Sequence, residues 1–200
     1  VLKFADDTKL FRRIRSIDDN SALQSDLDKL IAWSQEWLMF FNTQKCKVMH
    51  IGKTNRQFDY SMNGKDVISN TEMERDLGVI VSKDMKVFNH CSSAYGKANK
   101  MLGLIKRNIK HKKKDIMLRL YKSIVRPHVE YCSSAWNPYY RKDVDLIERI
   151  QHRFTRLFPD LRKIPYLDRL KDLGLWSLEE RRNRADLIEV SKLLKGFSSV

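Results

Sequence analysis

The sequence is poor in the residues that interrupt regular structure and in those that cross-link small folds. Its 200 residues include 7 glycines, 4 prolines and 3 cysteines. So little glycine and proline excludes a collagen-like or low-complexity chain, and 42% hydrophobic residues can fill a packed core. No apolar run approaches the roughly 18 residues that span a bilayer, so no membrane partner is expected.

The cysteines, Cys46, Cys91 and Cys132, are odd in number and widely spaced. No Cys-x-x-Cys pair or Cys/His cluster occurs, which argues against a disulfide framework and against a zinc site. Reduced, buried thiols are the simpler prediction. The five histidines also lack metal-ligand spacing, and each is interpreted as structural. Neither a Gly-x-Ser-x-Gly elbow nor a phosphate loop is present.

Acidic residues are too few to balance the basic ones, and the excess of positive charge is distributed unevenly along the chain. The net charge is +14. Residues 1–100 carry 16 Lys and Arg against 13 Asp and Glu, whereas residues 101–200 carry 23 against 12. A basic half of this kind favours a polyanionic partner, most often nucleic acid, although a merely basic surface remains an alternative.

Hydrophobic periodicity predicts an α+β fold whose second half is helical. One amphipathic helix is expected over residues 17–40, with acidic residues in its early turns. Later helices are expected over residues 88–108, 113–135, 141–157, 165–173 and 178–195. Pro127 should kink or split the second of these. The chain therefore changes character near residue 85.

Strands are expected in the first part of the chain. Residues 1–4 and 9–14 should flank a tip that contains Asp6 and Asp7. Asn63-Gly64 should close another hairpin with a type I′ turn, between residues 58–62 and 65–68. Residues 46–51 and 77–81 also have strand character.

Adjacent acids at a tight turn can form part of a metal site. Two Mg²⁺ ions held by carboxylates are a standard device for in-line phosphoryl transfer, and Mg²⁺ prefers one or two carboxylates plus substrate phosphates. The dipeptide alone is weak support, because Asp18-Asp19 in the same chain reads as charge at a helix N-terminus.

An ordered set of motifs resembles the reverse transcriptases of non-long-terminal-repeat (LINE-type) retrotransposons. Phe4-Ala5-Asp6-Asp7 is similar to their aromatic-Ala-Asp-Asp signature. The segment Asn42-Thr43-Gln44-Lys45-Cys46-Lys47 resembles their Asn-x-x-Lys-x-Lys block, and the segment 75–79 resembles their Leu-Gly turn at the primer grip. Blocks at 123–131, 135–136 and 177–182 resemble the helical region after the palm. The resemblance covers essentially the whole chain.

The resemblance implies an RNA-directed DNA polymerase. Residues 1–85 would be a partial palm with antiparallel strands and a long helix, and residues 86–200 a helical, basic, thumb-like region. Mg²⁺ would be the cofactor. The partners would be an RNA template, a DNA primer, deoxynucleoside triphosphates and the rest of the retrotransposon polyprotein. An intracellular, nuclear location is implied in the same way.

Residue roles follow from the matching motifs. Asp6 would ligate the catalytic metals with Asp7 beside it, and Phe4 and Ala5 would shape the turn near the primer end. Lys45 or Lys47 would lie near the triphosphate, or else be solvated lysines that flank a strand. Leu77-Gly78 would place a backbone turn against the primer, because glycine allows close approach.

The family's other metal-binding aspartate lies on a strand upstream of the Asp-Asp motif. That strand has no counterpart after Val1, so we expect a C-terminal fragment that is inactive by itself. Loss of one carboxylate from a two-metal site should cost roughly thousands-fold in rate.

Nucleic-acid binding through the helical half is the alternative function. A concentration of positive charge is expected to contact phosphates; it comprises Lys97, Lys100, Lys106, Arg107, Lys110, Lys112, Lys113 and Lys114. A solvated basic face remains the alternative for these residues. The aromatic residues Trp136, Tyr139 and Tyr140 could stack on bases, but a core position at a helix corner is favoured.

Overall fold

The computed structural model describes residues 1–64, 66–111 and 113–197. These residues form two compact units. Unit 1 comprises Val1–Glu74 with Ser82–Met85, and unit 2 comprises Arg75–Val81 with the described residues of Lys86–Val200. Helices and small two-stranded sheets are both present, which is compatible with the predicted α+β class. The division into palm and thumb-like domains stays a prediction.

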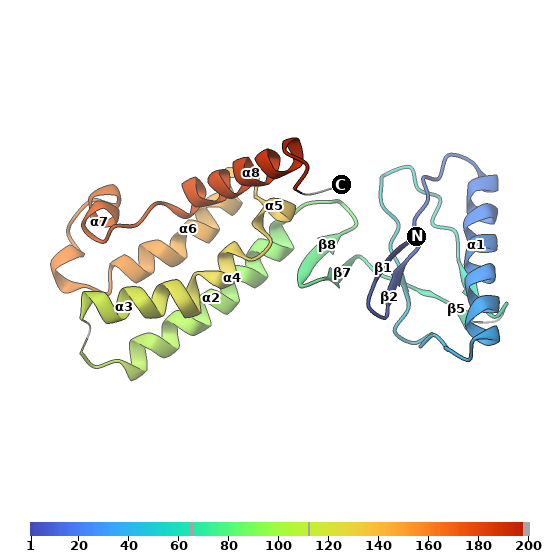
Figure 1. Ribbon diagram of the computed structural model, residues 1–200, viewed down its shortest axis with the longest axis horizontal. Helices are drawn as coiled ribbons and strands as arrows, with labels where there is room; N and C mark the ends of the chain where they lie inside the picture. The colour runs from blue at the N-terminus through green and yellow to red at the C-terminus, as the bar shows by residue number, and fades with distance from the viewer. Residues whose placement is uncertain (65, 112, 198–200) are drawn as a thin grey trace. The chain divides into compact units, whose positions relative to one another are not determined.

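Unit 1 contains one long helix and several short strands (Figure 1). Its elements are β1 (Leu2–Phe4), β2 (Asp7–Lys9), α1 (Ile17–Glu36), β3 (Lys47–Val48), β4 (Ser61–Met62), β5 (Asp66–Val67) and β6 (Ser69–Asn70). The pairs β1–β2 and β4–β5 are antiparallel, and β3–β6 is parallel. A further hairpin is formed by β7 (Met73–Asp76) and β8 (Val79–Ser82).

The first helix ends four residues earlier than its hydrophobic pattern predicted. Leu38 adopts a left-handed backbone with φ +55°. Its N–H donates to the carbonyl of Gln35, and the N–H of Met39 donates to the carbonyl of Ser34 at 2.8 Å. These two bonds form a Schellman motif, which satisfies the last carbonyls and turns the chain away. The prediction of helix through residues 37–40 was therefore wrong.

The core of unit 1 is small, and hydrogen bonds between α1 and β4 supplement it. Its buried residues are Ile31, Tyr60, Met62 and Ile68. The side-chain amide of Gln24, on α1, both donates to the carbonyl of Ser61 (2.9 Å) and accepts from its N–H (3.0 Å). The amide thus acts as a partner strand for β4 and fixes the hairpin on the helix.

Unit 2 is helical apart from its share of the β7–β8 hairpin. Its helices are α2 (Phe88–Asn108), α3 (Lys114–Leu120), the π-helix η1 (Tyr121–Val125), α4 (Pro127–Glu130), α5 (Ser133–Trp136), α6 (Arg141–Thr155), the 3-10 helix η2 (Pro159–Leu161), α7 (Tyr166–Asp172) and α8 (Leu178–Leu194). The predicted helices at 88–108, 141–157, 165–173 and 178–195 are confirmed to within two residues at each end.

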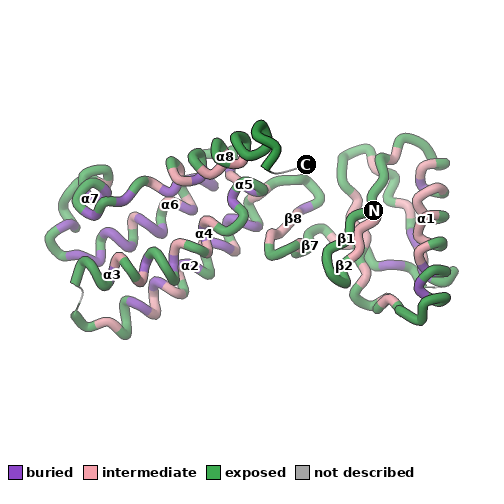
Figure 2. Tube along the Cα trace, in the orientation of Figure 1, coloured by how far each residue is buried: buried purple, intermediate pink, exposed green. Residues whose placement is uncertain are grey.

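A single core joins these helices. Most of its buried residues come from α2, from α6 and from α3, η1 and α4, and the tube in Figure 2 is purple at buried residues. Tyr121 stacks on Phe154 with ring centroids 4.1 Å apart, and Phe158 meets Phe154 edge-on. In the described part of the chain, no helix has both the length and the apolar character needed to cross a bilayer.

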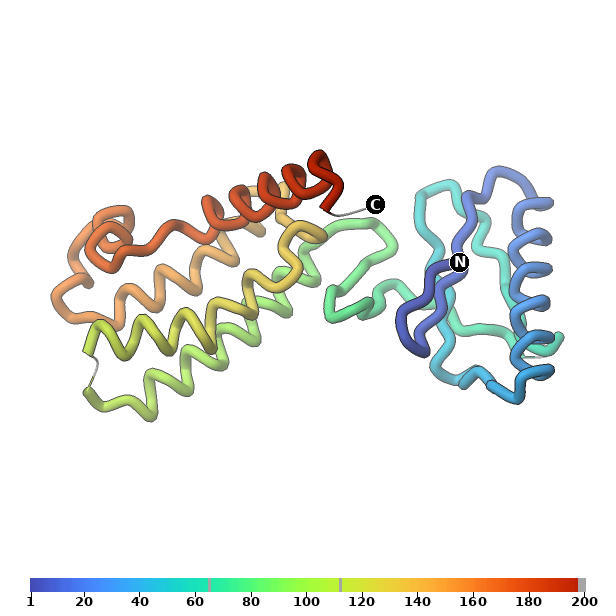
Figure 3. The backbone as a smooth tube through the Cα atoms, viewed as in Figure 1, coloured from blue at the N-terminus to red at the C-terminus, as the bar shows by residue number. Residues whose placement is uncertain are grey.

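The helix predicted over residues 113–135 continues past Pro127 with a widened turn, and it breaks between α4 and α5, at Tyr131 and Cys132. Proline has no N–H and crowds the carbonyl four residues before it. The turn before it widens, so the N–H of Arg126 donates to the carbonyl of Tyr121, five residues back, at 2.9 Å. Figure 3 traces α3, η1 and α4 as one continuous rod, and Pro127 is the first residue of α4.

Strand predictions were less accurate. The strand expected over residues 9–14 instead begins at Asp7 and ends at Lys9, and residues 46–51 yield only the two residues of β3. The Asn63-Gly64 turn is confirmed, because both residues have positive φ as a type I′ turn requires. Strands β6 and β7 were missed. Met73–Asp76 is mostly charged and carries no alternating apolar pattern.

Candidate catalytic carboxylates and basic surfaces

Asp6 and Asp7 lie at the tip of the β1–β2 hairpin. Phe4 pairs with Asp7 in the ladder, so the loop consists of Ala5 and Asp6. Ala5 has φ +51°, a left-handed conformation that is costly for a residue with a side chain. Both carboxylates are exposed to solvent. The tip is therefore one residue earlier than the sequence suggested, and it presents the two acids to solvent.

The donor chemistry of this tip fits Mg²⁺ in part. Two carboxylates are the protein share that Mg²⁺ often uses, with water and phosphate oxygens completing its shell. Among the described residues, no group of three or more His, Cys, Asp or Glu side chains gathers here or elsewhere. Asp6 and Asp7 are thus the candidate ligands that unit 1 offers at this hairpin.

The second Asp-Asp pair has a structural role, as expected. Asp19 accepts hydrogen bonds from the backbone N–H groups of Arg15 (2.8 Å) and Ser16 (3.1 Å) at the start of α1. These two bonds lower the pKa of Asp19 below its usual value. A carboxylate in this position caps the helix. The neighbouring Asp18 lies in the same first turn of α1 and serves as a control residue for Asp6.

The two lysines proposed to lie near a triphosphate differ in their surroundings. Lys45 is exposed in the turn before β3. Lys47 lies on β3, where its ammonium donates to the hydroxyl of Ser69 at 2.7 Å across the parallel β3–β6 pair. This contact holds Lys47 along the sheet, whereas Lys45 is exposed to solvent.

Leu77 and Gly78 form the tight turn between β7 and β8, and both have positive φ, +44° and +86°. A side chain at Gly78 would meet the ring of Tyr131 at 3.1 Å, and the hydroxyl of Tyr131 donates to the carbonyl of Leu77 at 3.0 Å. The close approach that glycine allows is therefore made to Tyr131. The proposed contact with a primer strand stays a prediction.

The predicted basic cluster divides between α2 and the loop that follows it. Lys97, Lys100, Lys106 and Arg107 lie on the exposed side of α2, and Lys110 and Lys113 lie in the exposed loop. Lys114 is different, because its ammonium pairs with Asp160 (3.0 Å) and Asp172 (2.9 Å). These pairs raise the pKa of Lys114 and neutralise much of its charge. Lys112 lies outside the described residues.

A second basic surface, missed by the sequence analysis, is a groove along α6. It has a volume of about 830 Å³ and is bordered by α2, α7 and the start of α8. Four arginines line it: Arg141, Arg149, Arg153 and Arg156. Their spacing of three, four and eight residues places them on one helix face, a pattern that an arginine count along the predicted helix could have revealed.

The charges of this α6 groove are only partly balanced. Arg141 pairs with Asp145 and Glu179, each at 3.0 Å. Arg153 donates to the hydroxyl of Tyr95 and to the amide oxygen of Asn99. In the part of the chain that the structure describes, no carboxylate lies within ion-pair distance of Arg149, Arg153 or Arg156. With Asp145, Glu148 and Glu179 also in its lining, the groove has a formal net charge of +1, and three of its four arginines have no carboxylate partner among the described residues.

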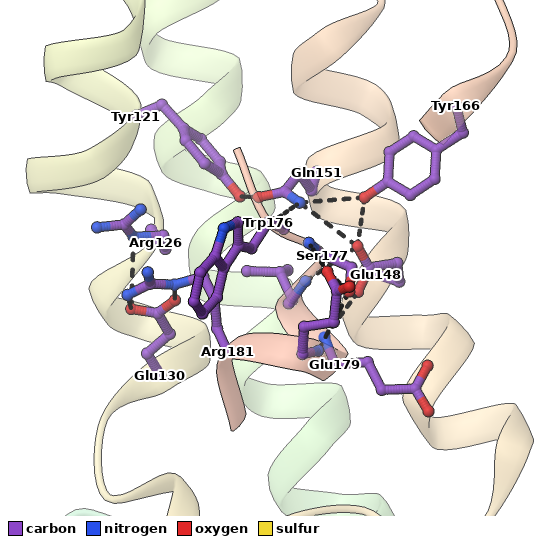
Figure 4. Close-up of polar contacts among 12 residues, drawn as sticks. Tyr121, Arg126, Glu130, Glu148, Gln151, Tyr166, Trp176, Ser177, Glu179 and Arg181 are labelled. Atoms are coloured by element: carbon purple, nitrogen blue, oxygen red, sulfur yellow. Dashed lines mark hydrogen bonds and ion pairs between the residues drawn. The ribbon is translucent and has the colours of Figure 1, made fainter. Parts of the chain in front are cut away.

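At the wall of the groove, a partly buried polar network fixes the helices. Glu148 accepts hydrogen bonds from the hydroxyl of Tyr166 and from the N–H groups of Leu178 (3.1 Å) and Glu179 (3.2 Å). Gln151 accepts from the hydroxyl of Tyr121 and donates to the carbonyl of Trp176, each at 2.9 Å. Figure 4 shows these contacts joining α6 to η1, α7 and the start of α8.

The remaining predictions for single residues had mixed outcomes. Trp136 is in the core with 2% of its surface exposed, but Tyr139 is 92% exposed, so a core position was right only for the tryptophan. Cys91 is buried as expected, whereas Cys46 is half-buried and Cys132 exposed. Burial, aided by the charge of Asp143, raises the pKa of the Cys91 thiol to about 12.

Comparison with known proteins found no match to this chain among protein-family models, curated proteins or solved structures. The resemblance to reverse transcriptases therefore rests on the residues and their order.

Proposed function

We propose that this chain is part of the polymerising region of a reverse transcriptase of the non-long-terminal-repeat type, with unit 1 contributing to its palm and unit 2 to its thumb-like region. The observation that carries the proposal is the placement of Asp6 and Asp7. Within an ordered set of matching motifs, they lie together, exposed, at the tip of a tight hairpin.

In this function, bound Mg²⁺ would activate the primer hydroxyl and stabilise the leaving pyrophosphate. Asp6 and Asp7 would hold the metal through their carboxylate oxygens. The β1–β2 ladder fixes the direction in which they leave the backbone, because Phe4 and Asp7 are paired residues. Lys45, exposed and close in sequence to β3, would supply a cation for the triphosphate.

Nucleotide incorporation on a primed RNA template should test the role of Asp6. The measurement uses the chain joined to whatever precedes Val1 in its reading frame. Asp6→Asn should reduce incorporation by roughly a thousandfold or more, because a metal-ligand carboxylate is lost. Asp18→Asn, in the first turn of α1, should leave the rate unchanged.

Equal rates for Asp6→Asn and the unsubstituted protein would refute the metal assignment. Absence of incorporation by the unsubstituted protein, with its upstream sequence restored, would count against polymerase function.

The second candidate function is nucleic-acid binding without catalysis. It is favoured by Arg149, Arg153 and Arg156 of the α6 groove, which have no carboxylate partner among the described residues, and by the exposed cations of α2, a helix that borders the groove. Such residues neutralise phosphates without reading sequence, and the resulting affinity falls steeply with salt.

Salt dependence of binding to an RNA–DNA duplex tests this candidate. Arg149→Gln with Arg156→Gln should flatten the slope of log affinity against log salt by about two, one for each lost phosphate contact. Lys29→Gln with Lys53→Gln removes the same charge from exposed sites of unit 1 and is the control. An unchanged slope in the arginine variant would refute the groove assignment. Replacement of residues 112–114 tests the loop in the same way, with Lys114 contributing least because it is paired.

A further inference from the structure

A small basic pocket lies on unit 2 beside the π-helical turn, and it shares no lining residue with the α6 groove. Its volume is about 230 Å³. It is lined by Lys122, Arg126, Gly174, Leu175, Trp176, Arg181 and Arg184. Four of these seven side chains are cationic and none is acidic, so the pocket favours an anion.

The ion pairs around this pocket leave it positive. Glu130 contacts Arg126 at 3.4 Å and also forms a bidentate pair with Arg181. Figure 4 shows both arginines converging on this one carboxylate. Within the described residues, neither Lys122 nor Arg184 has an acid within ion-pair distance. Glu130 therefore pairs with two of the four cations, and the other two are left without an acidic partner among the described residues.

The backbone around the pocket includes a π-helical turn, and hydrogen bonds from buried side chains hold the opposite wall. Lys122 belongs to η1, and the wide turn ends at Arg126. Single π-helical turns are rare and occur frequently at functional sites. On the opposite wall, the carbonyl of Trp176 accepts from Gln151, which itself is held by Tyr121. The walls are thus fixed from behind by the partly buried network.

The tryptophan at the rim supplies a flat apolar surface. Trp176 is 51% exposed, and the guanidinium of Arg184 lies 5.0 Å from the centre of its ring. Guanidinium groups match the geometry of phosphate oxygens, and exposed aromatic rings beside cations are a common platform for unpaired bases.

We propose that this pocket binds one phosphate of a single-stranded nucleic acid, with an adjacent base stacked on Trp176. The volume is below that of pockets which enclose a drug-sized ligand, so a phosphate fits while the base remains outside at the rim. A single strand is required because the faces of duplex bases are already stacked. The proposal does not depend on polymerase activity.

Binding of a labelled oligothymidylate of about eight nucleotides to the whole chain tests this pocket. Trp176→Ala should weaken binding on the order of tenfold. Lys122→Ala with Arg184→Ala should weaken it and flatten its salt dependence. Lys192→Ala is the control, because this residue lies on the same helix and outside the pocket. The oligonucleotide should also quench tryptophan fluorescence, and this quenching should be lost in Trp176→Phe.

Three results would overturn the proposal. Binding unchanged in both the tryptophan and the cation variants would exclude the pocket. Equal losses in Trp176→Ala for the oligonucleotide and for heparin, a polyanion without bases, would exclude stacking. Equal affinity for a duplex of the same length would exclude the preference for a single strand. Since none of these measurements involves nucleotide incorporation, they fail or succeed separately from the test of Asp6.

Discussion

Individual residues show how environment, rather than residue type, decides a role in this chain. His90 illustrates this. Its Nδ1 accepts from the N–H of Ile80 at 3.1 Å, and its ring lies 4.6 Å from that of Trp136. It is a buried structural histidine that anchors β8 to α2, in agreement with the interpretation made from its sequence context.

Stability should fall in mild acid because of His90. Burial lowers its pKa below the ordinary value, and the charges of Lys97 and Arg75 lower it further. His90 therefore binds a proton more readily in the unfolded state than in the folded state. The contribution of His90 to folding stability is complete above about pH 6.5 and is lost as the pH falls through its lower pKa in the folded state. Urea unfolding between pH 7 and 5 measures this loss.

The variant His90→Asn should reduce that pH dependence, since an amide oxygen can still accept from Ile80 but does not titrate. His111→Asn, at an exposed loop position, is the matched control. A pH dependence identical in His90→Asn and the unsubstituted chain would contradict the assignment. Any contribution of His152, whose pKa burial also lowers, would remain in both variants.

Among the elements, α8 depends on contacts made by another helix. Ser177 and Glu180 form a capping box at its start, and the carboxylate of Glu148 on α6 accepts from two further N–H groups. A negative charge at this position also interacts favourably with the positive end of the helix dipole. The position of α8 is thus coupled to that of α6.

Glu148→Ala should destabilise unit 2 by about 2–3 kcal/mol, because it leaves the hydroxyl of Tyr166 and two helix N–H groups without their acceptor. Glu148→Gln keeps one acceptor oxygen and should cost less. Chemical denaturation measures both changes. Glu189→Ala removes a surface ion pair with Lys192, so it should cost little and is the control. Equal costs for Glu148→Ala and Glu189→Ala would refute the capping role.

At the scale of the whole molecule, two units with unequal cores should unfold separately. Unit 2 has one continuous core drawn from α2 to the start of α8, whereas four buried apolar residues form the core of unit 1. A small core gives marginal stability. Thermal or urea unfolding of the whole chain should therefore show two transitions, with unit 1 unfolding first.

A fragment of residues 75–200 should retain the second transition at an unchanged midpoint. Hydrogen exchange assigns each transition to its unit, with slow exchange expected in α2 and α6. One cooperative transition for the whole chain, lost in the fragment, would contradict independent units.

The sequence by itself determined the positions of four helices of unit 2, the Asn63-Gly64 turn and the excess positive charge of residues 101–200. Periodicity placed α2, α6, α7 and α8 because each buries one apolar face, and Asn63-Gly64 and Pro127 acted through local backbone geometry that no partner alters. The apolar runs that flank Asp6 and Asp7 likewise predicted that these acids lie at a hairpin.

Only the tertiary structure decided which charges remain free. Lys114 pairs with Asp160 and Asp172, and Arg141 pairs with Glu179, and each of these pairs joins residues far apart in the chain. It also assembled the pocket beside Trp176 from two segments about 50 residues apart. Such pairings depend on how the helices pack, and short-range sequence patterns carry no information about that packing.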